Sequence, residues 1–193
     1  ITIAANDVTK VYDGKPLTGS WSLVSGSLEE GYELVVTFTK SITDAGEDET
    51  EIVSYKVMND ASDVTGNYII TVGRTKGKLT VTQREVTLTS KSAAKQYDGT
   101  PLVKPVVAIA GNGFVAGEAT ASSTGIITKV GSVKNTIVIE EGAGFKADNY
   151  EITKNEGTLE ITKNTDTIVI TADDGTWVYD GQAHSKNTYK VAG

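Results

Sequence analysis

Apolar residues alternate with threonine in several short stretches of the chain. The clearest cases are Ile1-Thr2-Ile3, Val86-Thr87-Leu88-Thr89 and Ile168-Val169-Ile170-Thr171. A period of two places alternate side chains on one face of a strand, so each stretch predicts a β-strand with one buried face. No stretch keeps an apolar period of 3.6 residues, which disfavours long helices. The other elements expected are strands at residues 34–39, 51–57, 119–123 and 136–139, and at most a short helical turn within residues 59–65.

Two short motifs recur in the same order. Tyr12-Asp13-Gly14 returns as Tyr97-Asp98-Gly99 and again as Tyr179-Asp180-Gly181. Asn67-Tyr68 and Asn149-Tyr150 follow the first two copies, and each is followed by Gly-x-Leu. Two markers that return together after roughly 80 residues predict tandem structural units.

The motif spacing divides the chain into unit 1 at residues 1–83, unit 2 at residues 84–163, and the truncated start of a third unit at residues 164–193. Each full unit is long enough for a small domain, whereas the last part is too short to fold alone. The junctions contain no Gly/Ser-rich tether and no Pro-rich spacer. We therefore expect an all-β fold of small tandem domains in an elongated, semi-rigid array, where each unit contacts its neighbours.

Composition narrows the function. The chain has 193 residues, a net charge of −7, no cysteine and one histidine. An acidic chain without clustered Lys and Arg disfavours a nucleic-acid partner, and no apolar run is long enough to span a bilayer. His184 has no counterpart in units 1 and 2, so we expect it at the surface and expect no enzyme, no cofactor and no metal. The acidic run at residues 44–51 could bind calcium, but a solvated hairpin tip is favoured.

The recurrence of the motifs indicates a structural role for their residues. Tyr12, Tyr97 and Tyr179 share one motif position, which favours a ring in the core and a hydroxyl bonded to a turn. Asp13, Asp98 and Asp180 are expected to cap the turn, while Gly14, Gly99 and Gly181 supply the positive φ it requires.

Trp21 and Trp177 are the candidate ligand-binding residues, because an exposed indole can stack on a sugar ring. Unit 2 has valine near the position of Trp21, which favours packing for that residue. Trp177 lies close to a junction, so burial between units is expected there.

A covalent cross-link is a further hypothesis. Some surface domains join a Lys to an Asn inside the core, and Lys10 with Asn67 and Lys95 with Asn149 recur at similar separations. The sequence favours the unlinked alternative, because Asn before Tyr is common in turns.

The order Tyr-Asp-Gly, Asn-Tyr and Gly-x-Leu-x-Val/Ile-Thr resembles the MBG/YDG repeats of large bacterial surface proteins and adhesins. The resemblance implies display outside the cell and a β-grasp-like unit, with an immunoglobulin-like sandwich as the alternative. It implies neighbouring repeats as partners and a monomeric stalk that projects another domain from the envelope. The alternative function is an adhesin module that binds mucin, another host glycoprotein or a polysaccharide.

Overall fold

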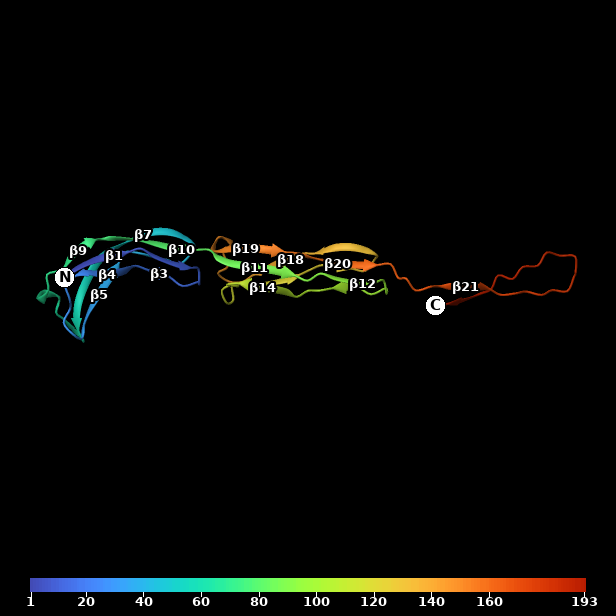
Figure 1. The fold of residues 1–193 in the computed structure, drawn as a ribbon, viewed down its shortest axis with the longest axis horizontal. Coiled ribbons are helices and arrows are strands. Elements are labelled where there is room, and N and C mark those ends of the chain that lie inside the picture. Colours follow the sequence, from blue (N-terminus) through green and yellow to red (C-terminus); the bar gives the residue numbers. More distant parts are fainter.

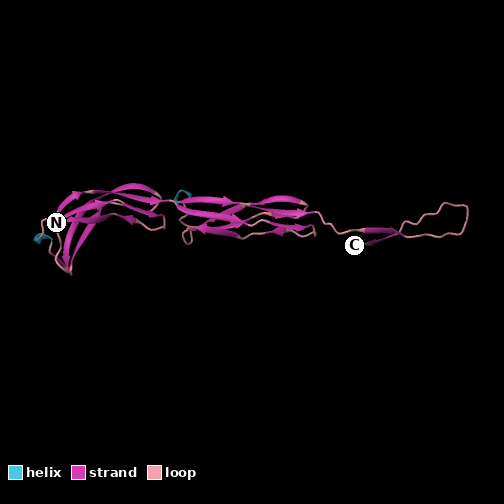
Figure 2. Ribbon diagram, in the orientation of Figure 1, coloured by secondary structure: helices cyan, strands magenta, loops and turns pink.

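The computed structural model describes residues 1–193 and is built almost entirely from strands. Its only helical elements are two single 3₁₀ turns, η1 (Thr65–Asn67) and η2 (Ala147–Asn149). Figure 2 shows these turns beside the strands that make up the rest of each unit. The chain forms no helix with the length and apolar character needed to cross a membrane. The expected all-β fold class is confirmed.

Unit 1 contains two larger sheets with a common pattern and one small two-stranded sheet, β3–β6. In one sheet β1 is central, antiparallel to β4 and parallel to β9. In the other, β10 lies between β2, to which it is parallel, and β7, to which it is antiparallel, and β5 extends β7. The strands are β1 (Thr2–Asn6), β2 (Val8–Val11), β3 (Leu17–Thr18), β4 (Ser20–Ser25), β5 (Tyr32–Phe38), β6 (Ser41–Ile42), β7 (Gly46–Asn59), β8 (Ser62–Asp63), β9 (Thr71–Arg74) and β10 (Lys76–Thr82).

Unit 2 repeats this pairing scheme. β11 is antiparallel to β14 and parallel to β19, and β20 is parallel to β12 and antiparallel to β17. The small pairs β3–β6 and β13–β16 also correspond, with Leu17 opposite Ile42 and Leu102 opposite Ile127. The strands are β11 (Arg84–Ser90), β12 (Ala93–Gln96), β13 (Leu102–Val103), β14 (Val107–Gly111), β15 (Ala119–Ser123), β16 (Ile126–Ile127), β17 (Gly131–Asn135), β18 (Ile137–Glu141), β19 (Tyr150–Asn155) and β20 (Gly157–Thr162).

Residues 164–193 form one antiparallel hairpin from β21 (Val169–Ala172) and β22 (Tyr189–Ala192). Ile170 lies opposite Val191 in this hairpin, as Leu88 lies opposite Ile109 in unit 2. The hairpin therefore corresponds to the β11–β14 pair. Both of its strands are exposed along their whole length.

Three sequence expectations are wrong in detail. The helical turn falls at η1, after residues 59–65 have largely formed strand and turn. The acidic run is not a hairpin tip, because most of it belongs to β7, where Glu47 and Glu49 form ion pairs with Lys78 and Lys76 of the neighbouring strand β10. A β-grasp unit packs a helix across its sheet, whereas these units pack strands alone.

The apolar core does not stop at the boundary between units 1 and 2. Figure 1 shows the units one after the other along the long axis, with residues 164–193 beyond them. A small cluster around Ile3, Leu34 and Val57 fills the first end of unit 1. A second small cluster, Leu102, Leu159 and Ile161, fills the far end of unit 2. The largest cluster contains residues of both units: Tyr12, Leu17, Leu79 and Val81 from unit 1, and Val86, Leu88, Ile137 and Tyr150 from unit 2.

Candidate functional site

The Tyr-Asp-Gly motif forms a tight turn at the end of β2. The Asp13 carboxylate accepts a hydrogen bond from the backbone N–H of Lys15 at 2.9 Å. It also forms an ion pair with Lys10 Nζ at 2.6 Å. These two interactions lower the pKa of Asp13, the Lys10 contact most strongly. Gly14 adopts a φ of 75°, which glycine reaches without the steric cost of a side chain.

The other two copies of the motif form the same turn. Asp98 accepts the N–H of Thr100 and Asp180 accepts the N–H of Gln182, each at 2.9 Å. Gly99 and Gly181 adopt φ values of 80° and 77°. The expected roles of these aspartates and glycines are thus confirmed, because the turn depends only on residues within the motif.

The tyrosine of the motif behaves differently in each copy. Tyr12 is only 3 % exposed, whereas Tyr97 is 43 % exposed and Tyr179 is 94 % exposed. The Tyr12 hydroxyl donates to Glu118 Oε1 of unit 2 at 2.8 Å, across the boundary between the units. Both predictions hold for Tyr12, since its ring is in the core and Glu118 belongs to a turn, although that turn lies in the other unit. The prediction of a core ring is wrong for Tyr97 and Tyr179.

Glu118 is a buried carboxylate held by two tyrosines. Its other oxygen, Oε2, accepts the hydroxyl of Tyr150 at 2.6 Å. The Tyr150 hydroxyl in turn accepts the backbone N–H of Val115 at 3.1 Å. Burial first, and then the hydrogen bond to Glu118, raises the pKa of Tyr150 to about 12 and raises that of Tyr12 above its ordinary value.

Three aromatic rings surround Tyr150, one of the two tyrosines that bond Glu118. Tyr12 meets Tyr150 edge-on, with ring centroids 5.6 Å apart. Phe114 meets Tyr150 edge-on at 5.3 Å, and Phe145 stacks on Tyr150 at 5.5 Å. Edge-on and offset contacts of this kind stabilise a pair by about 0.5–1.5 kcal/mol beyond the area that they bury.

A second polar contact crosses the joint next to the tyrosines. Asn149 is buried; its Oδ1 accepts the N–H of Ala45 at 2.7 Å, and its Nδ2 donates to Asp44 Oδ1 at 3.0 Å. Lys146 Nζ contacts the other oxygen of Asp44 at 2.5 Å. The Lys146 contact and then the Asn149 contact lower the pKa of Asp44.

The connecting residues also bond both units. Arg84 Nη1 donates to the carbonyl of Tyr12 at 3.3 Å, while its Nε donates to the carbonyl of Gly113 at 2.7 Å. Gln83 Nε2 donates to the carbonyl of Asp148 at 3.0 Å. The side chains of Gln83, which connects β10 to β11, and of Arg84, the first residue of β11, therefore hold the joint in addition to the backbone.

We call the residues of unit 1 that enter this joint its tail surface (Tyr12, Gly14, Leu17, Asp44, Ala45) and those of unit 2 that receive them its head surface (Val115, Glu118, Lys146, Asn149, Tyr150). A β-carbon on Gly14 would lie 3.2 Å from Val115 Cγ1 and 3.4 Å from Glu118 Oε1. A β-carbon on Gly99, at the uncovered end of unit 2, would meet nothing within 4 Å.

The Asn-Tyr motif belongs to the head surface. Asn149 and Tyr150 are buried against unit 1, whereas the equivalent Asn67 is exposed and Tyr68 is half-buried at the first end of unit 1. Tyr68 keeps one local contact of Tyr150, since its hydroxyl accepts the N–H of Glu29 at 3.3 Å. The two recurrent motifs thus lie at opposite ends of a unit, and they meet across the boundary.

This placement contradicts the Lys–Asn cross-link. Lys95 contacts Asp98 and Thr100 in its own turn, as Lys10 contacts Asp13. The side chain of Asn149 is occupied by Ala45 and Asp44. Each lysine lies beside the Tyr-Asp-Gly turn of its unit, whereas Asn67 and Asn149 lie in η1 and η2 at the other end, so no amide bond can join them.

The two tryptophans lie outside the joint. Trp21 is half-buried and packs against the Ile3, Leu34 and Val57 cluster, which is the packing role that the sequence favours. Trp177 is 45 % exposed and stacks on His184, with centroids 5.4 Å apart. The expected burial of Trp177 between units is wrong, because its only aromatic neighbour belongs to the same hairpin loop.

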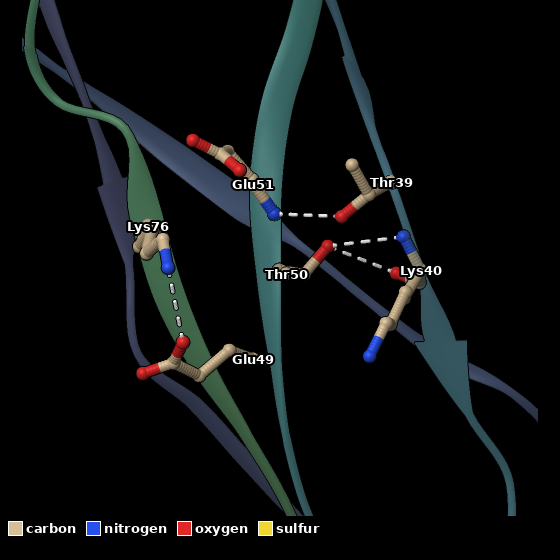
Figure 3. Close-up of a pocket in the computed structure, with 6 residues that line it drawn as sticks. All are labelled: Thr39, Lys40, Glu49, Thr50, Glu51 and Lys76. Carbon is tan, nitrogen blue, oxygen red and sulfur yellow. Dashed lines mark hydrogen bonds and ion pairs between the residues drawn. The ribbon is translucent and has the colours of Figure 1, made fainter.

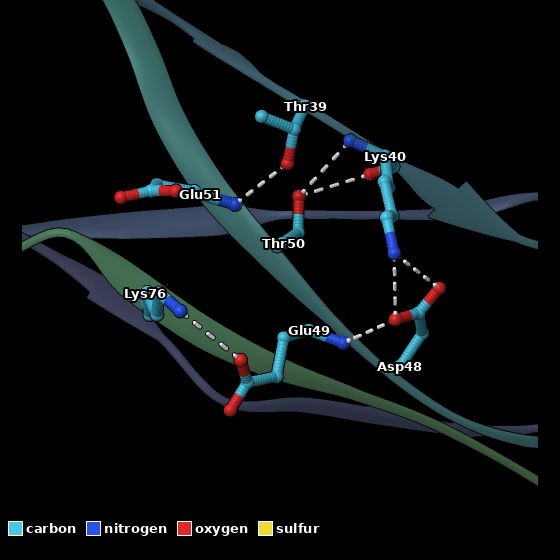
Figure 4. Close-up of polar contacts among 7 residues, drawn as sticks. All are labelled: Thr39, Lys40, Asp48, Glu49, Thr50, Glu51 and Lys76. Atoms are coloured by element: carbon cyan, nitrogen blue, oxygen red, sulfur yellow. Dashed lines mark hydrogen bonds and ion pairs between the residues drawn. The ribbon is translucent and has the colours of Figure 1, made fainter.

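A polar cavity of about 230 Å³ lies on unit 1, between the β5–β6 connection, β7 and β10. Figure 3 shows its side chains paired with one another: Lys76 with Glu49, and the Thr50 hydroxyl with the backbone of Lys40. Figure 4 adds Asp48, whose two carboxylate oxygens each lie 3.0 Å from Lys40 Nζ. The polar groups that line this cavity therefore bond one another.

The buried threonine of this cavity has a scaffold role that recurs in unit 2. Lys40 N donates to Thr50 Oγ1 at 3.3 Å, and Gly125 N donates to Asn135 Oδ1 at 3.2 Å at the equivalent place. A contact that appears in both units supports the fold. No three acidic, histidine or cysteine side chains are grouped so that they could hold a metal ion.

Sequence analysis missed Glu118, Arg84 and Lys146. Glu118 lies three residues after Val115, whose N–H bonds the Tyr150 hydroxyl. In unit 1, Tyr32 lies three residues after the residue whose N–H bonds the Tyr68 hydroxyl, so Tyr32 is the equivalent of Glu118. Aligning the sequences of the two units therefore places Glu118 opposite Tyr32, so recurrence between the units does not reveal Glu118 as a joint residue. The available signal was a lone acidic residue between the apolar segments 113–115 and 119–121.

Comparison with known proteins finds no family model that matches the chain, and no curated protein or solved structure with significant similarity. The resemblance to the MBG/YDG repeats therefore rests on the motifs alone.

Proposed function

We propose that the chain is made of non-catalytic stalk units of a bacterial surface or secreted protein. In this proposal, residues 1–83 and 84–163 are two units and residues 164–193 open a third. The units hold a functional domain away from the envelope, their main partners are neighbouring units, and the array acts as a monomer without a cofactor.

The joint between units 1 and 2 carries this proposal. A tether would leave the units free to reorient, but here one apolar cluster spans both of them. The Tyr12–Glu118 hydrogen bond is buried within that joint, so bending would break it while the Tyr150–Glu118 bond stays within unit 2. The bend would also separate the apolar residues of the shared cluster, which costs free energy. Such a joint resists reorientation, which is what a projecting stalk requires.

The motifs support the placement outside the cell only through resemblance. Tyr12-Asp13-Gly14 and its copies are shared with repeats of bacterial surface proteins, and the joint gives these residues a mechanical role. A stalk needs the tail surface and the head surface in every unit, which accounts for their recurrence without a binding site.

The proposal is tested by measuring whether the two units tumble as one body. Residual dipolar couplings from weakly aligned protein should fit one alignment tensor for residues 1–163. Tyr12→Ala should give two independent tensors, while Tyr97→Ala, which changes the uncovered copy of the same motif, should leave one. Independent tensors in the unaltered protein would refute a rigid stalk.

A second candidate is an adhesin module for mucin or another glycan. The observation in its favour is Trp177, which is 45 % exposed beside the exposed Tyr179. A glycan and mucin panel should then show binding that Trp177→Ala removes and Trp21→Ala retains. If the folded protein binds nothing in the panel, the stalk is the only proposed function that stands.

A further inference from the structure

The far end of unit 2 carries a second tail surface that nothing covers. Tyr97, Gly99 and Leu102 hold the places of Tyr12, Gly14 and Leu17, and the backbone N–H of each tyrosine bonds the strand behind it at 2.9 Å. The Leu102, Leu159 and Ile161 cluster corresponds to Leu17, Leu79 and Val81. In unit 1 these residues continue into the core of the next unit, whereas in unit 2 they end at an exposed tyrosine.

The charge of this second tail surface is reversed. Gly46 and Gly131 open β7 and β17 with φ values of 148° and 143°, which fixes the correspondence between the two units. Two residues earlier, unit 1 has Asp44 and unit 2 has Lys129. Asp44 is the residue that meets Lys146 and Asn149 across the joint.

The only other head surface on this chain does not fit that tail. The first end of unit 1 has Tyr32 in the place of Glu118, so it offers no carboxylate to the Tyr97 hydroxyl. It has Val64 in the place of Lys146, ahead of the equivalent 3₁₀ turn. A second copy of this chain therefore has no carboxylate at the place of Glu118 and no charged side chain at the place of Lys146.

We propose that the uncovered end of unit 2 is a docking surface for the head of a further unit of this fold, and that the partner carries a carboxylate for Tyr97 and an acidic side chain facing Lys129. The proposal rests on the proposed stalk function. The residue at position 44 or 129 then selects the neighbour by charge, because opposite charges across an interface favour the correct pairing and like charges oppose the wrong one.

The existing joint of the full chain tests this selection. Asp44→Lys gives the tail of unit 1 the charge of the unit 2 tail, and Lys146→Glu gives the head of unit 2 the charge that the proposal requires. Asp44→Asn is the control, because it removes the charge and keeps an acceptor for Asn149. The measurement is amide hydrogen exchange at Ala45, whose N–H bonds Asn149 across the joint.

Asp44→Lys should speed exchange at Ala45 by roughly tenfold or more, because it replaces an ion pair by a like-charge contact and removes an acceptor. Adding Lys146→Glu should restore most of the protection. Asp44→Asn should exchange at Ala45 more slowly than Asp44→Lys and faster than the double variant. A double variant that exchanges as fast as Asp44→Lys alone would overturn the proposal. Independent tumbling of the unaltered units would instead refute the stalk itself, so the two failures are distinguishable.

Discussion

The two complete ends of the Tyr-Asp-Gly type share the same turn and differ in what covers them. Around Tyr12 and around Tyr97 the turn, its capping aspartate, its lysine contact and its positive-φ glycine are the same. Tyr12 is nevertheless buried by unit 2 and bonded to Glu118, while Tyr97 faces solvent. The comparison teaches that the motif builds its turn alone, and that its tyrosine gains a stabilising role only when a matching head surface is present.

The largest difference is expected from truncation of the two tyrosines. Tyr12→Ala removes a ring from the shared core and should lower the free energy of unfolding by about 3–5 kcal/mol. Tyr97→Ala removes an exposed ring and should change it by no more than about 0.5 kcal/mol. Urea unfolding followed by near-ultraviolet circular dichroism measures both.

A second pair of variants separates the hydrogen bond from the ring. Tyr12→Phe leaves one oxygen of Glu118 without its donor and should cost about 1.5–3 kcal/mol, while Tyr97→Phe should have no measurable effect. Equal losses from the Tyr12 and Tyr97 variants would show that the burial of Tyr12 does not stabilise the protein.

An intermediate effect is expected at alkaline pH. The folded protein raises the pKa of Tyr150 to about 12, so the neutral hydroxyl is favoured in the folded state. The resulting stability is complete below the ordinary tyrosine pKa of about 10 and is lost as the pH rises toward the folded value. Tyrosinate absorbance and unfolding, measured together through this range, should show the joint opening as Tyr150 ionises.

The control for this titration is Tyr150→Phe, which cannot ionise. It should be less stable than the unaltered protein at neutral pH, but its stability should depend less on pH above about 10. An unchanged alkaline loss in this variant would assign the effect to other groups.

The smallest effect compares the two glycines of the turn. Gly14→Ala and Gly99→Ala both place a side chain at positive φ, which costs about 1–2 kcal/mol in each case. Gly14→Ala also brings a β-carbon within 3.2 Å of Val115, so unit 2 must shift slightly. The Gly14 variant should therefore lose about 1 kcal/mol more in thermal unfolding. If Gly99→Ala loses as much, the close approach of the two units is not a constraint.

The sequence alone determined the strands and the order of their motifs. Alternation in Val86-Thr87-Leu88-Thr89 predicted β11 because a strand with one buried face requires a period of two. The turn at Asp13 was equally predictable, since its carboxylate bonds an N–H only two residues away. Both are local properties, and a local property repeats wherever the residues repeat.

Only the tertiary structure decided which of the repeated side chains meet a partner. Tyr12 and Glu118 are 106 residues apart, and nothing in either segment specifies the other. The neighbour of Tyr12 is set by the packing of two apolar clusters into one, and Lys146 meets Asp44 only as a consequence of that packing. Burial depends on what covers a surface, so the motif tyrosine is in the core at the end of unit 1 and exposed at the end of unit 2.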